Sequence, residues 1–244
     1  MNVLVVGAGS MGRWVARTLR EQADAAVAFV DTDSDAALRA ADAVGGRAVA
    51  TDTEGRFDLV CVAVPMPVAH VAIEEYGPLA TEAVVDVTGS MTDPLAAMAE
   101  TAPNRQRASL HPLFAPANAP GSIAVVTAAG GDTVDRVVEA LAAAGNDPFE
   151  TTSVEHDSAM ESVQAAAHAA VLAYAMAAED IPERFHTPVS AGLQSLVDRV
   201  LGGEAHVYAD VQAAFDGADA VADAARTIAD ADHDAFVELY DDLQ

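Results

Sequence analysis

The chain has no lysine, and all 12 of its basic residues are arginine. The absence of a side-chain amine excludes Schiff-base chemistry, Walker-type phosphate binding and acid catalysis by lysine. The chain also has a single cysteine, Cys61, so no disulfide can form within it. Because Cys61 lies inside the apolar run 59–64, we expect it to be a buried core thiol.

Basic residues are scarce relative to acidic ones. The 38 aspartates and glutamates give a formal net charge of −26. Such a charge opposes binding to nucleic acid and to anionic membranes, and it destabilises a folded chain by self-repulsion unless salt screens it. Acid excess, abundant alanine and few aromatic residues are together typical of proteins from salt-accumulating microbes. We therefore expect a halophilic protein that requires molar salt.

Long hydrophobic runs are also absent. No apolar run reaches the roughly 20 residues that cross a membrane. No basic segment precedes the first apolar run, residues 3–6, so we expect no signal peptide and a cytoplasmic protein. The hydrophobic content of 52% is nevertheless enough for a sizeable core, and 244 residues suit one large domain or two smaller ones.

Residues 3–31 carry the most informative pattern: an apolar strand, a glycine turn, a helix, a second strand and an acid. Gly7 allows the tight turn, Gly9 lets the backbone approach a pyrophosphate, and Gly12 lets the helix pack close to the sheet. The helix N-terminus attracts the phosphates. Asp31 is placed to bind a ribose diol and to repel a 2′-phosphate, which favours NAD over NADP. The expected contacts to NAD are Gly7, Gly9, Ser10, Met11, Gly12 and Asp31, with Val64 and Pro65 further along the chain.

Apolar strands alternate with helical patterns in the first half, which predicts an α/β fold with a doubly wound, mainly parallel sheet of the Rossmann type. The expected strands are 2–6, 26–31, 47–50, 57–64, 83–87, 107–110, 122–127 and 148–152. The helices expected between them are 11–22, 33–44, 67–76, 92–100 and 132–144. Only helical patterns follow, at 154–179, 187–202, 204–215 and 217–240. We expect a NAD-binding domain at 1–152 and an all-helical dimerisation domain at 153–244, although the alanine-rich helix at 154–179 could instead be buried within one chain.

Two expected strands end in residues suited to a ligand. Val64 ends the apolar run 59–64 and Pro65 follows it, where the chain turns outward toward a cofactor. Ser90 follows another apolar strand and offers a hydroxyl near the expected nicotinamide. A plain strand-ending turn and a helix cap are the respective alternatives.

His111 gives the sharper signal for catalysis, because it follows an apolar strand and precedes Pro112. Histidine has an ordinary pKa near 6.5, which suits it to accept a proton at neutral pH. A hydride can leave an alcohol carbon only if the hydroxyl proton also finds an acceptor. A histidine bonded to backbone at a strand end is the alternative.

The second half offers an isolated cation and a polar stripe. Arg199 lies among apolar neighbours, so it is a candidate to bind an anionic substrate, unless it simply pairs with Asp198. Asp157, Glu161 and His168 share a helical face with Gln164, a pattern that is most often solvated. No spacing of ligands indicates a metal site.

In their order, these blocks resemble the prephenate dehydrogenase family, particularly its compact archaeal-type members. The matching blocks are the glycine turn to Asp31, Val64-Pro65, residues 86–90, residues 111–114, residues 155–157 with His168, and Arg199 with residues 208–212. The chain departs from the family pattern at Met91, Ala115, Glu204 and Phe215.

The resemblance implies NAD-dependent oxidative decarboxylation of prephenate to 4-hydroxyphenylpyruvate, a step in tyrosine biosynthesis, by a homodimer. It assigns His111 as the acceptor of the hydrogen bond from the substrate hydroxyl and Ser90 as the residue that orients either His111 or that hydroxyl. It assigns His168 and Arg199 as the groups that hold the two carboxylates. Two alternatives remain: another two-domain reductase, acting on arogenate or an imine, and a catalytically silent NAD-binding dimer.

Overall fold

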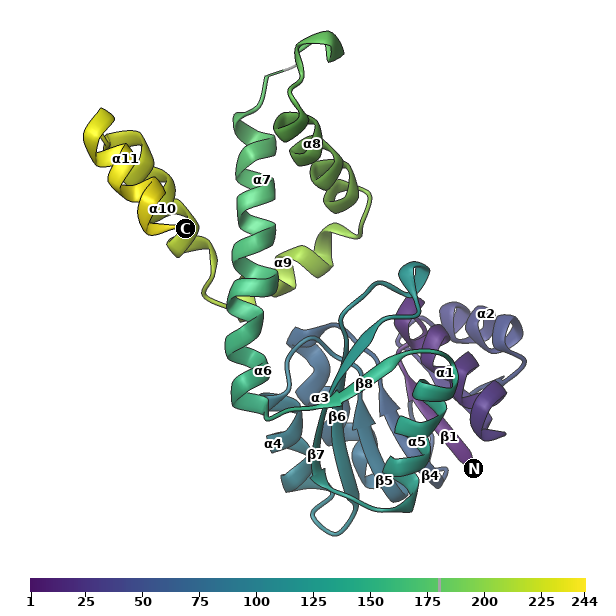
Figure 1. Ribbon diagram of the computed structural model, residues 1–244. Coiled ribbons are helices and arrows are strands. Elements are labelled where there is room, and N and C mark those ends of the chain that lie inside the picture. The colour runs from purple at the N-terminus through teal and green to yellow at the C-terminus, as the bar shows by residue number, and fades with distance from the viewer. Residues whose placement is uncertain (180) are drawn as a thin grey trace. The chain divides into compact units, whose positions relative to one another are not determined.

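The computed structural model describes residues 1–179 and 181–244. It divides into two compact units, Met1–Asp157 and Ser158–Gln244, which we call unit 1 and unit 2. Unit 1 alternates strands with helices, whereas the described part of unit 2 is helical (Figure 1).

Unit 1 is built on an eight-stranded sheet with the order β3-β2-β1-β4-β5-β6-β7-β8. The strands are β1 (Asn2–Val6), β2 (Ala26–Val30), β3 (Arg47–Ala48), β4 (Phe57–Val62), β5 (Ala80–Asp86), β6 (Gln106–Pro112), β7 (Ser122–Ala129) and β8 (Asp147–Glu150). All neighbours pair in parallel except β6 and β7. The order reverses between β1 and β4, so the carboxyl ends of these strands form the crevice where doubly wound sheets bind their ligands. The predicted α/β fold is confirmed.

Helices cover both faces of this sheet (Figure 1). They are α1 (Ser10–Ala23), α2 (Ser34–Val44), α3 (Ala69–Tyr76), α4 (Thr92–Thr101) and α5 (Asp132–Ala143). Val3 and Val5 of β1 pack in one core with α1, α2 and α5, while Leu4 and Val6 pack in the other with α3 and α4. Strands buried on both faces need apolar residues at every position, which explains the continuous apolar runs.

Unit 2 departs from the predicted helices in two places. Its helices, beginning with the one that enters it from unit 1, are α6 (Ser153–Met160), α7 (Ala167–Ala177), α8 (Pro188–Leu201), α9 (Ala205–Ala214), α10 (Ala218–Asp230) and α11 (His233–Asp242). The helix expected at 154–179 contains a π-helical segment, Glu161–Ala166. The helix expected at 217–240 is two helices, because the chain is extended at Ala231 and Asp232 caps α11 by accepting from the Ala235 backbone N–H.

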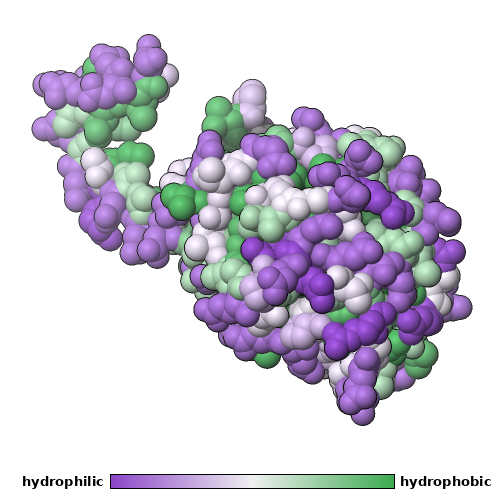
Figure 2. All heavy atoms as spheres, turned by 90° about the horizontal axis from the view of Figure 1, so that it is seen from below, coloured by the Kyte–Doolittle hydropathy of each residue, from purple (hydrophilic) through white to green (hydrophobic). Residues whose placement is uncertain are grey.

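The visible face in Figure 2 is mostly hydrophilic, with apolar patches scattered over it. None of the described helices is long and apolar enough to cross a bilayer. Cys61 is fully buried, as predicted, and burial raises the pKa of its thiol.

Candidate active site

The glycine turn between β1 and α1 has the shape that a bound pyrophosphate requires. Gly7 has a φ of 101°, and a Cβ there would collide with the Ala63 carbonyl oxygen. A Cβ on Gly12 would collide with the Gly7 carbonyl oxygen, whereas a Cβ on Gly9 would meet nothing within 4 Å. Gly7 and Gly12 are therefore needed for packing, and Gly9 leaves open space at the N-terminus of α1. No side chain caps that terminus, and its first turn carries no acid.

Asp31 lies directly after β2 and is tied to the same turn. Its Oδ2 accepts from the Ala8 N–H at 2.7 Å, and its Oδ1 accepts from the Asp33 N–H at 2.9 Å. The carboxylate therefore has a fixed position beside the glycine turn. This is the arrangement that a ribose diol requires, so these residues fit NAD.

Ser10 and Met11 form the first turn of α1, and Val64 and Pro65 follow β4. A Cβ on Gly7 would also lie 3.1 Å from Cγ1 of Val64, so the end of β4 packs directly against the glycine turn. Five of the predicted cofactor contacts thus belong to one turn, and Val64 lies beside it. Pro65 is the N-cap of the short 3-10 helix Met66–Val68.

The ends of β5 and β6 bring a buried polar group together. Asp86 closes β5 and lies opposite Ser109 of β6, both with no exposed surface. Oδ1 of Asp86 accepts from the Thr88 backbone N–H at 3.0 Å and from the Thr88 hydroxyl at 2.6 Å. The Thr88 hydroxyl also lies 3.1 Å from the Ser90 carbonyl oxygen. Asp86 thereby fixes the turn that presents Ser90, whose own hydroxyl makes no hydrogen bond to the described residues.

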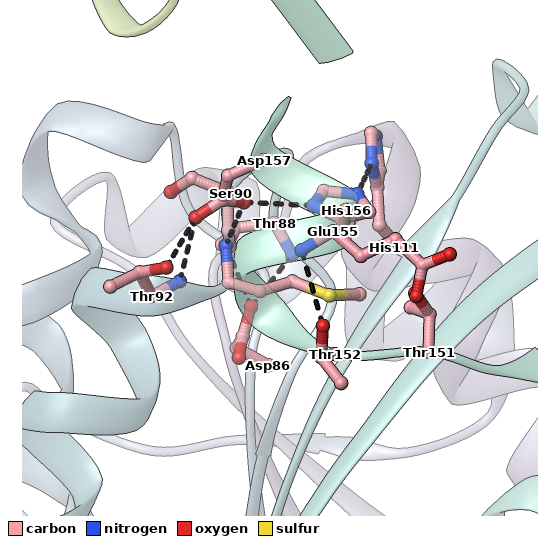
Figure 3. A network of polar contacts seen from close by, with 11 residues as sticks. Asp86, Thr88, Ser90, Thr92, His111, Thr151, Thr152, Glu155, His156 and Asp157 are labelled. Carbon is pink, nitrogen blue, oxygen red and sulfur yellow. Dashed lines mark hydrogen bonds and ion pairs between the residues drawn. The ribbon is translucent and has the colours of Figure 1, made fainter. Parts of the chain in front are cut away.

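The sequence predicted a strand that ends at residue 110, with His111 directly after it. In the structure β6 continues to Pro112, so His111 lies within the strand. Its Nδ1 lies 2.8 Å from Nε2 of His156, and the two rings meet at 74° (Figure 3). Nδ1 of His156 lies 2.8 Å from Oδ1 of Asp157. His111 is 7% exposed and His156 3%. The candidate catalytic histidine therefore belongs to a buried chain of two imidazoles and a carboxylate.

Asp157 also binds the start of α4. Oδ1 accepts from the Met91 N–H at 3.1 Å, and Oδ2 accepts from the Thr92 N–H at 3.1 Å and the Thr92 hydroxyl at 2.5 Å. α4 has no side-chain cap of its own, so a carboxylate 65 residues away supplies one. A negative group is favoured at this helix end by the unpaired N–H groups and the helix dipole.

The environment sets the charges of this network. Burial lowers the pKa of His111 to about 3, and the neighbouring His156 lowers it further than Asp157 can offset. Burial raises the pKa of Asp86 to about 6, against the opposing effect of its bonds from Thr88. Burial would also raise the pKa of Asp157, but the hydrogen bonds from His156, Thr92 and Met91 hold it below its ordinary value. At neutral pH, His111 is therefore a neutral acceptor and Asp157 a carboxylate.

The two remaining predicted residues belong to unit 2. Burial lowers the pKa of His168. Its ring packs edge-on against the ring of Tyr208, with the two ring centroids 4.8 Å apart. Its buried Nδ1 has no hydrogen-bond partner among the described residues. Arg199 is exposed in the last turn of α8 and makes no ion pair within the described part of the chain. Asp198, its expected partner, instead accepts from the Gln194 amide at 3.1 Å.

The sequence assigned no role to His156, and it placed Asp157 on a helical face of the kind that is most often solvated. The sequence feature that could have indicated them is a histidine–aspartate pair at the start of a helix that directly follows a strand. The structure places this pair beside the end of β6. Among the described residues, no three metal-ligating side chains gather into a metal site.

Comparison with known proteins identifies relatives that match nearly the whole chain. The chain is 32% identical to 4-amino-4-deoxyprephenate dehydrogenase from Streptomyces pristinaespiralis, over 99% of its own length and 89% of that protein. No family model matches it.

Two solved structures show the same fold. Prephenate dehydrogenase from Aquifex aeolicus, in complex with hydroxyphenyl propionate and NAD+, superposes with a TM-score of 0.74 at 14% identity, covering 100% of this chain and 96% of that one. Arogenate dehydrogenase from Synechocystis gives a TM-score of 0.63 at 17% identity, covering 94% and 90%.

The doubly wound sheet, the glycine turn and these relatives together define an NAD-dependent dehydrogenase. More particularly, the full-length relative places the chain in the prephenate dehydrogenase family.

Proposed function

We propose that the chain catalyses the oxidative decarboxylation of prephenate to 4-hydroxyphenylpyruvate with NAD. The observation that carries this proposal is a neutral, buried His111 at the carboxyl end of the sheet, in the same unit as the glycine turn. The family supplies the reaction type, and the geometry supplies an acceptor for the hydroxyl proton that the reaction must release.

NAD is held, in this proposal, by the unit 1 residues around the glycine turn. They are Gly7, Gly9, Ser10, Met11, Gly12, Asp31, Val64 and Pro65. When bound, NAD supplies the hydride acceptor. Asp31 selects NAD over NADP, because its fixed carboxylate would repel a 2′-phosphate.

His111 acts on the 4-hydroxyl of the ring, whose carbon is the one that loses hydride. As hydride leaves that carbon, the hydroxyl O–H bond breaks and His111 takes the proton, so the oxygen becomes a carbonyl. Loss of the ring carboxylate as carbon dioxide then makes the ring aromatic, and the resulting phenolate recovers the proton from His111. Ser90 orients the hydroxyl, since its own side chain is not engaged by the described residues.

The two carboxylates of prephenate are assigned to His168 and Arg199 of unit 2. Arg199 is an exposed guanidinium without an ion pair in the described structure, and its planar fork matches a carboxylate. In this scheme the first domain binds NAD, and the helical second domain holds substrate and forms the dimer.

A second candidate substrate is 4-amino-4-deoxyprephenate, which the Streptomyces pristinaespiralis relative is named for. A neutral imidazole accepts a hydrogen bond from an amine as well as from a hydroxyl. His111 therefore suits either substituent at the reacting carbon.

The experiment that decides between them follows NADH formation from prephenate, arogenate and 4-amino-4-deoxyprephenate. Each is tested with NAD and NADP, at high salt to screen the charge. We expect the highest kcat/KM with prephenate and NAD. A preference for the amino compound would assign the second activity, and NADH binding without any turnover would leave only a silent binder.

Replacing His111 by alanine should lower kcat by about 10²–10⁴-fold, because the proton acceptor is lost. The affinity for NADH should be unchanged, since His111 is not among the residues of the glycine turn. Steady-state kinetics and an NADH fluorescence titration measure the two effects. An unchanged kcat would remove His111 from the mechanism.

The chain is further proposed to be a homodimer that acts in the cytoplasm. α10 and α11 bury none of their residues, yet they carry large apolar side chains that are about half exposed, at Ile228, Phe236, Val237 and Tyr240. Apolar surface of this kind is typical of an interface with a second copy.

A further inference from the structure

Three side chains of unit 1 form one continuous line of hydrogen bonds that includes His111, the candidate catalytic residue. His156 lies in the middle, 2.8 Å from His111 on one side and 2.8 Å from Asp157 on the other. Both imidazoles are almost completely buried, so bulk water does not compete for these bonds. The position of each hydrogen in this line then follows from whether Asp157 donates or accepts hydrogen bonds.

Asp157 is an ionised carboxylate that can only accept hydrogen bonds. Its oxygens already accept from the Met91 N–H and from both the N–H and the hydroxyl of Thr92. Nδ1 of His156 must therefore carry the hydrogen of the bond between them. In a neutral His156, Nε2 is then an acceptor, so Nδ1 of His111 must donate to it. This leaves the lone pair of His111 on Nε2.

We propose that His156 and Asp157 are positioning residues that hold His111 in its Nδ1-protonated form, with Nε2 as the atom that accepts the substrate proton. This inference rests on the proposed function. In the reaction the substrate O–H bond breaks, an Nε2–H bond forms and His111 becomes an imidazolium. The Asp157 carboxylate, one imidazole away, stabilises that positive charge.

Asp86, at the end of β5, is a further ionisable group that acts on His156. If His156 were instead an imidazolium, its Nε2 would donate to Nδ1 of His111. The proton of His111 would then reside on Nε2, which could not accept from a hydroxyl. The two arrangements differ in which nitrogen of each ring is protonated, and that difference is measurable without any substrate.

The first test is nitrogen-15 NMR of the full chain, with labelled histidines, at neutral pH and with NADH bound. Loss of resonances in the His111→Asn and His156→Gln variants assigns the two rings. We expect both rings to be neutral, each with its proton on Nδ1 and none on Nε2. A proton on Nε2 of His111, or a doubly protonated His156, overturns the proposal.

The second test is Asp157→Asn, which removes the negative charge and replaces one carboxylate oxygen by an amide nitrogen. We expect the nitrogen to take the position of Oδ1, because an oxygen in the position of Oδ2 keeps both bonds from Thr92 at the loss of the bond from the Met91 N–H. The amide then donates to Nδ1 of His156, so Nε2 of His156 becomes the donor to His111, and His111 is left protonated on Nε2. We expect kcat to fall by about 10²–10⁴-fold with little change in KM, as loss of the productive tautomer does in other enzymes. The NMR pattern of His111 should invert at the same time.

Asp157 also caps α4, so Asp157→Asn could lower kcat by weakening that cap. Control variants separate this loss from the change in the His111 tautomer. Thr92→Val removes one bond to the other carboxylate oxygen, weakens the same cap and should cost much less kcat. Asp52→Asn changes an exposed acid of unit 1 and should leave kcat unchanged. A kcat for Asp157→Asn no lower than that of Thr92→Val overturns the proposal.

A pair of substitutions at His156 covers the case in which Asp157→Asn does not fold. His156→Gln keeps an acceptor for Nδ1 of His111, whereas His156→Leu fills a similar volume without one. We expect Gln to retain far more kcat than Leu, and equal losses contradict a positioning role. His70→Gln, on the exposed side of α3, is the matched control.

Failure of the proposed function and failure of the positioning role give different results. A wild-type chain that turns over none of the candidate substrates refutes the proposed function, while the NMR pattern still reports the tautomer. A wild-type chain that is active, with a His111 tautomer or a variant series that differs from expectation, refutes the positioning role alone.

Discussion

At the residue scale, His111 and Asp86 change the stability of unit 1 in opposite directions as the pH falls. The folded-state pKa of His111 is about 3, against an ordinary value near 6.5, so the unfolded chain binds the proton first. This contribution to the free energy of unfolding, roughly 5 kcal/mol at most, is present above pH 6.5 and is lost as the pH falls toward 3.

For Asp86 the sign is reversed. Its folded-state pKa is about 6, against an ordinary value of 3.8, so the folded chain binds the proton first. The free energy of unfolding therefore rises as the pH falls through this window, by about 3 kcal/mol at most. The buried carboxyl partly offsets the acid sensitivity caused by the buried histidine.

Urea unfolding at several pH values and constant salt tests this balance. Between pH 6.5 and 4, the free energy of unfolding of His111→Asn should fall less than that of the wild type. The variant has no histidine at this position that binds a proton more readily in the unfolded chain than in the folded one. The free energy of unfolding of Asp86→Asn should fall more, because the compensating proton uptake is gone. If the free energy of unfolding of both variants changes with pH as steeply as that of the wild type, neither group has a shifted pKa in the folded chain.

At the element scale, the turn between β1 and α1 separates glycines needed for folding from a glycine needed for binding. Gly9→Ala should change the free energy of unfolding by no more than about 1 kcal/mol, because its Cβ meets open space. Gly7→Ala should cost about 2–4 kcal/mol, because it combines a positive φ with a collision against Ala63.

The affinity for NADH completes this prediction. Gly9→Ala should weaken NADH binding by about tenfold or more, since its methyl group occupies the space expected for the pyrophosphate. Urea unfolding and a fluorescence titration on the same preparation measure both quantities. Wild-type affinity in a folded Gly9→Ala chain would place the phosphates elsewhere.

The π-helical segment Glu161–Ala166 is an element that the sequence did not reveal. The side-chain amide of Gln212 donates to the Ala165 carbonyl oxygen at 2.9 Å, within the segment. Gly217 packs so closely that a Cβ would collide with the Ala166 nitrogen and the Glu161 carbonyl oxygen. Because the segment adds a residue to the turn, Glu161 and His168 do not keep the α-helical spacing that predicted a common face.

At the scale of the whole molecule, the charge of −26 and the apolar surface of α10 and α11 act against each other. Two chains with this charge repel at low ionic strength, where the Debye length is about 30 Å, and much less in molar salt. Light scattering after size exclusion should therefore show a dimer at high salt and a growing monomer fraction as salt is removed. Phe236→Asp should abolish the dimer at every salt concentration, and a dimer that persists would place the interface elsewhere.

The sequence by itself determined the features that repeat locally along the chain. Continuous apolar runs indicated strands buried on both faces, and the spacing of Gly7, Gly9, Gly12 and Asp31 indicated the turn and the acid beside it. These patterns are readable because their physical causes, strand burial and backbone conformation, act on neighbouring residues. His111 was also proposed in this way, from its place at the end of an apolar strand.

Only the tertiary structure decided what surrounds His111. His156 is 45 residues away in sequence, and Asp157 caps a helix that begins 65 residues earlier. Hydrogen bonds between such distant residues leave no periodic pattern, since each side chain alone is also compatible with a solvated surface. Packing of α4 and the start of α6 against the ends of β5 and β6 buries these groups together, and burial is what fixes their charges and their bonding.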